Sequence, residues 1–375
     1  MNILIIMDSF KGTLSSSKAG SLISEYIKEI KNDINVKYQV FSDGGDGFLD
    51  ALRYNMPNIK SFTIHTVNQE MNDIDVDYLL DEDDRCYLES SKIVPFKEHM
   101  SSSITRRTSY GFGIVLSKLI DRGIKEFSIG LGGTCTNDGG LGILKAFGAK
   151  FIDKYGNDIF PTPDKFSSIT NIVLPKKINA SINLLSDVSN VLLGKNGATY
   201  TFGRQKGATE EELQLLEDGL SNIDRIISKK YGSSYSKCEG TGAAGGIAFS
   251  LYNLFSSCKV NSGCLELFNY MNLNKLLADT DYVITGEGRT DYQTLDGKAV
   301  DRIVSRCQQS NKKVVVISGS IDSSIEKELK DKGVVGLYSL VDNKVTADDL
   351  KIENVYKNLK KAVRNMMSDL ERGVI

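Results

Sequence analysis

The sequence predicts an α/β fold in which a Rossmann-like parallel-sheet domain is interrupted by a second, inserted α/β domain with a mixed sheet. The chain opens with an apolar strand, a helical segment and another strand, which is typical of a parallel, doubly wound sheet. The C-terminal part repeats this plan from residue 280 onward. Between the two, residues 60–98 alternate apolar and polar positions with polar turns, a pattern that favours antiparallel strands.

The N-terminal elements follow from spacing and capping. Residues 3–7 (ILIIM) are wholly apolar and predict a buried strand. Residues 15–31 carry apolar side chains at helical spacing after a serine that suits a helix cap, and residues 35–41 alternate as a second strand. These segments belong to the first domain.

The middle and C-terminal elements are predicted in the same way. Thr209 caps a helix over residues 209–231 that has three glutamates in its first turn. The other predicted elements, in chain order, are a helix at 112–121, a strand at 126–131, a helix at 141–149, a strand at 182–188, a helix after residue 246, a strand at 282–285, a helix from about 298, and strands at 314–318 and 334–340 that a helix separates. We therefore expect residues 1–60 and 280–375 to form the discontinuous Rossmann-like domain and residues 61–279 the inserted one.

Composition excludes several classes of protein. The 375 residues carry a net charge of −2 without a basic stripe, which argues against a nucleic-acid partner. No apolar run approaches the ~18 residues that a membrane helix needs, and the first apolar run is too short for a signal peptide. The six cysteines form no CxxC pair, and only two histidines are present. We expect a cytoplasmic protein with reduced thiols.

Five glycine-bearing loops are the strongest functional signal. They are SDGGDG (42–47), GLGGTCTNDGG (130–140), LLGKNGATYTFGRQKGA (192–208), GTGAAGG (240–246) and TGEGRTDYQTLDGKA (285–299). Glycine lets a ligand approach the main chain, and backbone amides before a helix attract anions. The second loop lies between a predicted strand and a predicted helix, so we expect it to bind an anion or a phosphate group; the alternative is a tight turn with unusual backbone angles.

Charged residues gather in or beside these loops. The acids are Asp8, Asp43, Asp46, Asp138, Asp187, Glu287 and Asp291, and the bases are Lys11, Arg204, Lys206, Arg289 and Lys298. Phosphoryl transfer needs carboxylates for Mg²⁺ and for the proton of an attacking hydroxyl, and cations for the phosphates. The loops therefore predict phosphate chemistry.

Other chemistries lack their residues. The Walker A pattern is absent, and GTGAAGG follows a polar segment instead of the strand that a dinucleotide fingerprint requires. No GxSxG motif with a histidine base is visible, and neither His65 nor His99 lies in a suggestive loop.

Taken in order, these motifs resemble those of the glycerate kinase family of class I type. The match comprises DSFKGTLS at 8–15, DGGDG at 43–47, TSYGFG at 108–113, the glycine loop at 130–140, the stretch 186–209, GTGAAGG and TGEGRTDYQTLDGKA, and so covers about residues 3–320. The chain departs from the family pattern at YLESSKI (87–93), which is more polar than usual, and at Arg107, where threonine is common.

The resemblance implies an activity that the residues alone do not define. It implies phosphorylation of D-glycerate by ATP with Mg²⁺ to give 2-phospho-D-glycerate, and two α/β domains with the active site in the cleft between them. Glycerate and ATP are then the partners, with no nucleic acid or membrane. The alternatives are a kinase for another small hydroxy acid and a non-catalytic sugar-acid or nucleotide sensor. The oligomeric state stays open.

Roles follow from residue chemistry. We expect Asp187 to act as the catalytic base, with Asp138 as its competitor unless Asp138 caps the following helix. Arg289 is the first choice for the glycerate carboxylate and Lys11 the second. Asp8 and Asp43 are the expected Mg²⁺ ligands, and Asp187 is a further candidate to bind the metal or its water.

The remaining candidates are substrate- or phosphate-binding residues, and which loop holds ATP and which holds glycerate stays open. They are Ser9, Gly44, Gly45, Gly132, Gly133, Thr134, Asn137, Asp138, Asn190, Gln205, Lys206, Gly242, Gly245, Glu287, Asp291 and Gln293.

Overall fold

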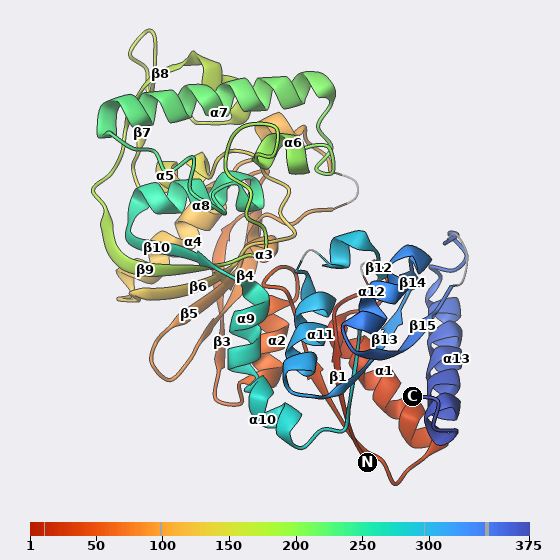
Figure 1. The fold of residues 1–375 in the computed structure, drawn as a ribbon. Coiled ribbons are helices and arrows are strands. Elements are labelled where there is room, and N and C mark those ends of the chain that lie inside the picture. The colour runs from red at the N-terminus through yellow and green to blue at the C-terminus, as the bar shows by residue number, and fades with distance from the viewer. Residues whose placement is uncertain (11, 98–99, 296, 342–344) are drawn as a thin grey trace. The chain divides into compact units, whose positions relative to one another are not determined.

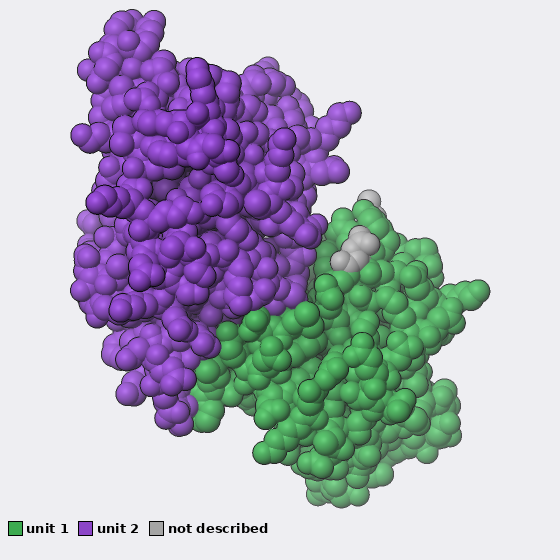
Figure 2. All heavy atoms as spheres, turned by 60° about the vertical axis from the view of Figure 1, so that its left-hand side comes forward, with its two compact units in different colours: residues 1–43, 50–57, 263–375 green, residues 44–49, 58–262 purple. Residues whose placement is uncertain are grey.

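The chain divides into two compact units, shown in separate colours in Figure 2. The computed structural model describes residues 1–10, 12–97, 100–295, 297–341 and 345–375. Unit 1 comprises residues 1–43, 50–57 and 263–375, and unit 2 comprises residues 44–49 and 58–262. The predicted division differs from these units in two ways: it gives residues 263–279 to the inserted part, and it gives residues 44–49 and 58–60 to the Rossmann-like domain.

Unit 1 is built on a parallel five-stranded sheet with the order β15-β13-β11-β1-β2. Every neighbouring pair in it is parallel. Its main strands are β1 (Asn2–Met7), β2 (Asn35–Val40), β11 (Tyr282–Gly286), β13 (Lys313–Ser318) and β15 (Val334–Ser339). A short pair, β12 (Arg289–Thr290) and β14 (Ser320–Ile321), lies beyond the sheet.

Helices α1 (Ser16–Ile30) and α13 (Ile352–Glu371) pack side by side on one face of this sheet (Figure 1). Their apolar side chains join Ile3, Ile5 and Met7 of strand β1 in one core. The predicted cap of α1 is confirmed, because the Ser15 side chain accepts from the Lys18 amide at 3.2 Å. The other helices of this unit are α9 (Gly263–Tyr270), α10 (Leu273–Ala278), α11 (Ala299–Gln309) and α12 (Glu326–Asp331).

Unit 2 contains a mixed six-stranded sheet with the order β10-β9-β6-β5-β4-β3. Antiparallel pairing joins β3, β4 and β5, as the alternation over residues 60–98 predicts, and the remaining pairs are parallel. The strands are β3 (Lys60–Val67), β4 (Asp73–Leu80), β5 (Cys86–Glu89), β6 (Glu126–Gly130), β9 (Ile178–Leu185) and β10 (Phe255–Asn261). A separate antiparallel pair is formed by β7 (Lys150–Asp153) and β8 (Ile169–Val173).

The helices of unit 2 complete a single buried core with this sheet. The predicted capping box of α7 (Glu210–Tyr231) is present at Thr209 and Glu212. The other helices are α3 (Ser90–Ile93), α4 (Tyr110–Asp121), α5 (Leu141–Ala146), α6 (Ala198–Phe202) and α8 (Ala243–Leu254), with the short 3₁₀ segments Ile104–Arg106 and Pro163–Ser168. Large side chains such as Phe112, Phe151 and Phe249 are fully buried in it.

The predicted fold class is confirmed by these two sheets, one parallel and one mixed. Helix α2 (Phe48–Asn55) contributes residues to both units, since the division falls within it. All six cysteines are free thiols. No helix among the described residues is long and apolar enough to cross a membrane.

Candidate active site

The carboxyl edge of the parallel sheet in unit 1 gathers three predicted loops. In the strand register, Val40 pairs with Met7 and Met7 pairs with Gly286. Asp8 directly follows Met7, and its amide donates to the Gly286 carbonyl at 2.9 Å. Asp43 follows the end of β2, and Glu287 follows β11. Open parallel sheets bind their ligands at this edge, which supports the choice of these acids.

Asp8 and Asp43 have the chemistry that Mg²⁺ requires, because hard carboxylate oxygens follow two adjacent strands. The Ser9 amide donates to Asp8 Oδ1 at 2.7 Å. Within the described ranges, no group of three or more His, Cys, Asp or Glu side chains could hold a metal ion. Mg²⁺ usually takes one or two carboxylates and completes its shell with water and phosphate oxygens, so two aspartates fit it. Lys11 lies outside the described residues.

The loop after β11 presents several charged side chains to solvent. Arg289 Nε lies 3.1 Å from Asp291 Oδ2, and the arginine side chain is 71% exposed. Lys298 donates to the Gln293 side-chain oxygen at 3.1 Å. Arg289 is therefore available to an anion, although Asp291 already pairs with it.

Glu287, at the start of the same loop, is more enclosed. Its Oε1 accepts from the Thr294 hydroxyl at 2.7 Å. Burial raises the pKa of the Glu287 carboxyl, and the hydrogen bond from Thr294 opposes that shift.

The carboxyl edge of the sheet in unit 2 gathers another set. Glu89 of β5 pairs with Gly130 of β6, which in turn pairs with Leu185 of β9. The glycine loop begins at Gly130, and Asp187 follows the end of β9. These three loops therefore start from neighbouring strands.

The first half of the glycine loop packs against the loop at residues 44–47. A Cβ on Gly132 would lie 2.6 Å from the Gly45 Cα, and one on Gly130 would lie 2.4 Å from the Gly44 carbonyl oxygen. Both distances are far below a normal contact. At these positions, glycine is required because one protein backbone approaches another.

The second half of the glycine loop packs in the same manner against GTGAAGG. A Cβ on Gly245 would lie 1.9 Å from the Thr136 carbonyl oxygen, and the Gly139 amide donates to the Gly245 carbonyl at 3.0 Å. Gly242 similarly abuts the Val191 carbonyl, at 2.3 Å from a would-be Cβ. At Gly242 and Gly245, the backbone that approaches so closely is the protein's own.

Asn137 and Asp138 have no exposed surface. Asp138 accepts from the Ser109 amide at 2.7 Å, the Ser109 hydroxyl at 2.8 Å and the Gly140 amide at 3.0 Å. Burial raises the pKa of the Asp138 carboxyl against these hydrogen bonds. Asp138 thus joins the starts of α4 and α5, which is the capping alternative to a catalytic role. The Asn137 amide donates to the Thr199 hydroxyl at 3.0 Å.

Lys206 lies buried beneath the glycine loop. Its ammonium donates to the Thr136 carbonyl at 2.7 Å and contacts the Thr134 hydroxyl at 3.4 Å. Burial lowers the pKa of Lys206 to about 8. Its neighbour Gln205 is exposed. Within the glycine loop, the residues open to solvent are Gly132 and Gly133.

Asp187 and Asn190 lie in the loop after β9. Asp187 is partly exposed and accepts a hydrogen bond from the Ser262 hydroxyl. Asn190 donates to the Asn196 carbonyl at 2.7 Å, which ties its side chain to the loop at residues 192–208. Of the two aspartates considered as the base, Asp187 is the one with exposed surface.

Sequence reasoning missed two buried charges in unit 2. Glu89 is 1% exposed and accepts from the backbone amides of Gly47 and Leu49. Arg107, also buried, donates to the carbonyls of Lys206 and Cys135. Both lie where the chain departs from the family pattern, and that departure was the available signal.

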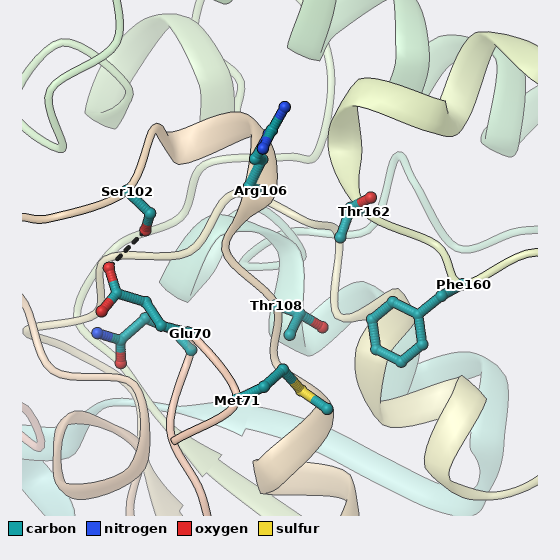
Figure 3. Close-up of a pocket in the computed structure, with 8 residues that line it drawn as sticks. Glu70, Met71, Ser102, Arg106, Thr108, Phe160 and Thr162 are labelled. Carbon is teal, nitrogen blue, oxygen red and sulfur yellow. Dashed lines mark hydrogen bonds between the residues drawn. The ribbon is translucent and has the colours of Figure 1, made fainter.

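A pocket of about 330 Å³ opens elsewhere in unit 2, and Figure 3 shows its lining. Phe160, Met71 and Thr108 lie around it, and Glu70 accepts from the Ser102 hydroxyl at 2.6 Å. None of the residues predicted to bind substrate lines it. Its apolar and mixed-charge lining is not that of a phosphate site.

Comparison with known proteins gives a family for the whole chain. The sequence model of the glycerate kinase family matches residues 3–371. Glycerate kinase of Bacillus subtilis (strain 168) is 28% identical over 391 residues, which cover 99% of this chain and 98% of that protein. Glycerate 2-kinase of Escherichia coli (strain K12) is 29% identical over 386 residues, which cover 100% of this chain and 99% of that protein.

The fold agrees with a solved structure. The "Crystal structure of putative glycerate kinase 2 from Salmonella typhimurium LT2" matches with a TM-score of 0.77 and 28% identity, covering 100% of this chain and 99% of that one. With the family model spanning nearly every residue, this protein belongs to the glycerate kinase family.

Proposed function

We propose that this protein transfers the γ-phosphoryl group of ATP to D-glycerate, with Mg²⁺, and releases 2-phospho-D-glycerate and ADP. The observation that carries the proposal is the full-length similarity to glycerate 2-kinase of Escherichia coli, a protein named for that regiochemistry. The strand-end carboxylates and the cations of the loops are the groups that such a reaction uses.

The proton of the attacking hydroxyl goes to Asp187 in this proposal. Asp187 is partly exposed at the end of a parallel strand, whereas Asp138 is enclosed and saturated by protein donors. A general base contributes typically ~10²–10⁴-fold, and positioning supplies most of the remaining rate.

The other charged residues of the loops bind the substrate and the metal ion in this proposal. Arg289, exposed and planar, binds the glycerate carboxylate through two parallel hydrogen bonds, and in doing so exchanges its contact with Asp291 for the substrate. Asp8 and Asp43 hold Mg²⁺, which supplies charge neutralisation for the phosphates. Lys11 remains the second choice for the substrate carboxylate.

The decisive experiment is a coupled assay of ADP formation with D-glycerate and a panel of other small hydroxy acids. We expect D-glycerate to give the highest kcat/KM, the product to carry phosphate on the 2-hydroxyl by ³¹P NMR, and excess chelator to abolish turnover. A different preferred acid would assign a related kinase. Ligand binding without turnover for any acid would assign a sensor, and either result would overturn the proposal.

A further inference from the structure

The N-terminus of α2 is already occupied by a carboxylate of the protein. The loop SDGGDG leads into this helix, and a helix N-terminus after a glycine-rich loop is where an anion normally binds. Here Glu89 Oε1 accepts from the Gly47 amide at 3.2 Å and Oε2 accepts from the Leu49 amide at 3.0 Å. A phosphate group cannot use the same two amides while Glu89 is in place.

The surroundings of Glu89 keep this carboxylate in one position. The Ser91 hydroxyl donates to Oε1 at 2.7 Å, and the Lys92 ammonium lies 3.7 Å from the same oxygen. The side chain is almost wholly excluded from solvent. Burial raises the pKa of the Glu89 carboxyl, while Lys92 and the hydrogen bonds oppose that shift. A buried carboxylate held by this many donors is a fixed structural anion.

Glu89 also lies where two predicted substrate loops meet. Gly44 and Gly45 pack against Gly130 and Gly132 with no room for a side chain. Ser91, whose hydroxyl Glu89 holds, lies beside Gly133: a Cβ on that glycine would be 3.2 Å from the Ser91 Cβ. Gly132 and Gly133 are the part of the glycine loop with surface exposed to solvent.

We propose that Glu89 is a positioning residue: by filling the anion site at the N-terminus of α2, it holds residues Gly44–Leu49 against the glycine loop and sets the position of Gly132 and Gly133. This inference rests on the proposed function, since it assigns Glu89 to the support of that site. It also means that the SDGGDG loop does not cradle phosphate at its helix N-terminus.

Replacement and chemical rescue test the proposal. Glu89→Ala removes the Cγ, Cδ and both oxygens, a set of atoms that acetate reproduces. We expect Glu89→Ala to lower kcat/KM for glycerate by roughly 10- to 100-fold, because the loop loses its fixed position. Acetate should restore both kcat/KM and Tm in a saturable way. Acetamide, which has the same shape without the charge, should restore neither.

A second variant covers the case in which Glu89→Ala does not fold. Glu89→Gln keeps the volume but presents an amide nitrogen to one backbone N–H, so kcat/KM should again fall with a smaller loss of Tm. Asp301→Asn is the matched control, since Asp301 is also a buried carboxylate with a lysine partner, Lys332, but lies in unit 1. It should lose stability without losing kcat/KM.

The outcomes separate the two proposals. Wild-type kcat/KM in Glu89→Gln, or equal effects of acetate and acetamide on Glu89→Ala, would overturn the role of Glu89. A wild-type protein that does not phosphorylate glycerate would overturn the proposed function. In that case, the acetate-dependent rise in the Tm of Glu89→Ala would still decide whether the carboxylate fills the helix terminus.

Discussion

Two glycine-bearing loops of this protein, at residues 130–140 and 285–299, have similar sequence patterns but differ in how far their polar side chains are buried. Both follow a parallel strand and both mix glycine with charged residues. In the first, Asn137 and Asp138 have no exposed surface, and Gly130 and Gly132 lie against the backbone of residues 44–45. In the second, Arg289 is largely exposed and Gln293 and Lys298 lie at the surface.

The difference shows what a glycine cluster can and cannot reveal. A missing Cβ indicates that something approaches the backbone closely, but protein and ligand meet that condition equally well. In the loop at 130–140, two other glycine segments of the same unit make the approach. In the loop at 285–299, Gly286 also meets backbone, since a Cβ there would lie 1.7 Å from the Ile317 carbonyl oxygen, but the charged side chains that follow it are exposed. Changes to those exposed side chains should therefore affect substrate more than folding.

The largest effect expected is on the stability of unit 2. Gly245→Ala places a Cβ against the Thr136 carbonyl at a backbone φ of 69°, and we expect the free energy of unfolding to fall by about 4 kcal/mol or more. Gly148→Ala is the control: its φ is 85° but nothing lies within 4 Å, so it should cost only about 1–2 kcal/mol. Urea denaturation measures both. Equal losses would show that the tight backbone contact is not what requires Gly245.

Two aspartates at the carboxyl edge of the mixed sheet, Asp187 and Asp138, should respond differently to replacement by asparagine. Asp187→Asn should lower kcat by roughly 10²–10⁴-fold with little change in Tm. Asp138→Asn should instead lower the free energy of unfolding by about 2–3 kcal/mol, because an amide cannot accept from all of its present donors. Steady-state kinetics and denaturation of both variants check this, and a reversed pattern would make Asp138 the base.

Lys206 provides a test by pH. Burial lowers its pKa from 10.5 to about 8, so between these values the unfolded chain binds more protons than the folded one. The free energy of unfolding should therefore rise with pH through this window, by about 3 kcal/mol. Below pH 8, the full cost of burying a charged Lys206 should destabilise the protein. Lys206→Met should lack this rise. If the free energies of unfolding of the wild type and of Lys206→Met change in the same way between neutral pH and about pH 10, the pKa of Lys206 is not lowered by burial.

The smallest effect expected comes from the exposed loop. Arg289→Lys should change the free energy of unfolding by less than about 0.5 kcal/mol, because the side chain is largely solvated. It should raise the apparent KM for glycerate about tenfold by removing the planar fork, and leave the KM for ATP nearly unchanged. Initial-rate kinetics with each substrate varied in turn provide the measurement. Equal changes in both KM values would remove Arg289 from the glycerate site.

Much of the fold could be predicted because, in many segments, the local sequence pattern favours the same helix or strand that the tertiary structure contains. The apolar run at 3–7, the Ser15 cap and the Thr209–Glu212 box each specify an element without reference to the rest of the chain. Strand β10 was missed because FSSCKVN is an edge strand with little buried surface and no clear alternation. Helix α13 was within reach, since Val355, Leu359, Val363 and Met366 follow helical spacing.

The candidate site was harder to predict because burial depends on contacts between distant segments. Nothing near Asn137 or Lys206 in the sequence indicates that both are enclosed; the segment around Gly245, a hundred residues away from the glycine loop, encloses the loop. The role of Glu89 can be recognised only when the fold places it beside the N-terminus of α2, which lies about 40 residues earlier in the chain. The sequence identifies the loops, whereas the structure separates their supporting residues from those that can meet a substrate.

The strand order of unit 1 has a consequence for synthesis. Strand β1 lies between β2 and β11, and β11, β13 and β15 are all made after the whole of unit 2. On the ribosome, the first 57 residues hold only two strands of a five-stranded sheet and cannot complete a core, while residues 58–262 carry every strand of the mixed sheet. Unit 2 can thus fold first, because both of its segments, residues 44–49 and 58–262, are made before β11, and the N-terminal strands must wait for β11. A chain truncated after residue 262 and released from the ribosome should already resist protease across residues 58–262 and remain sensitive before residue 43.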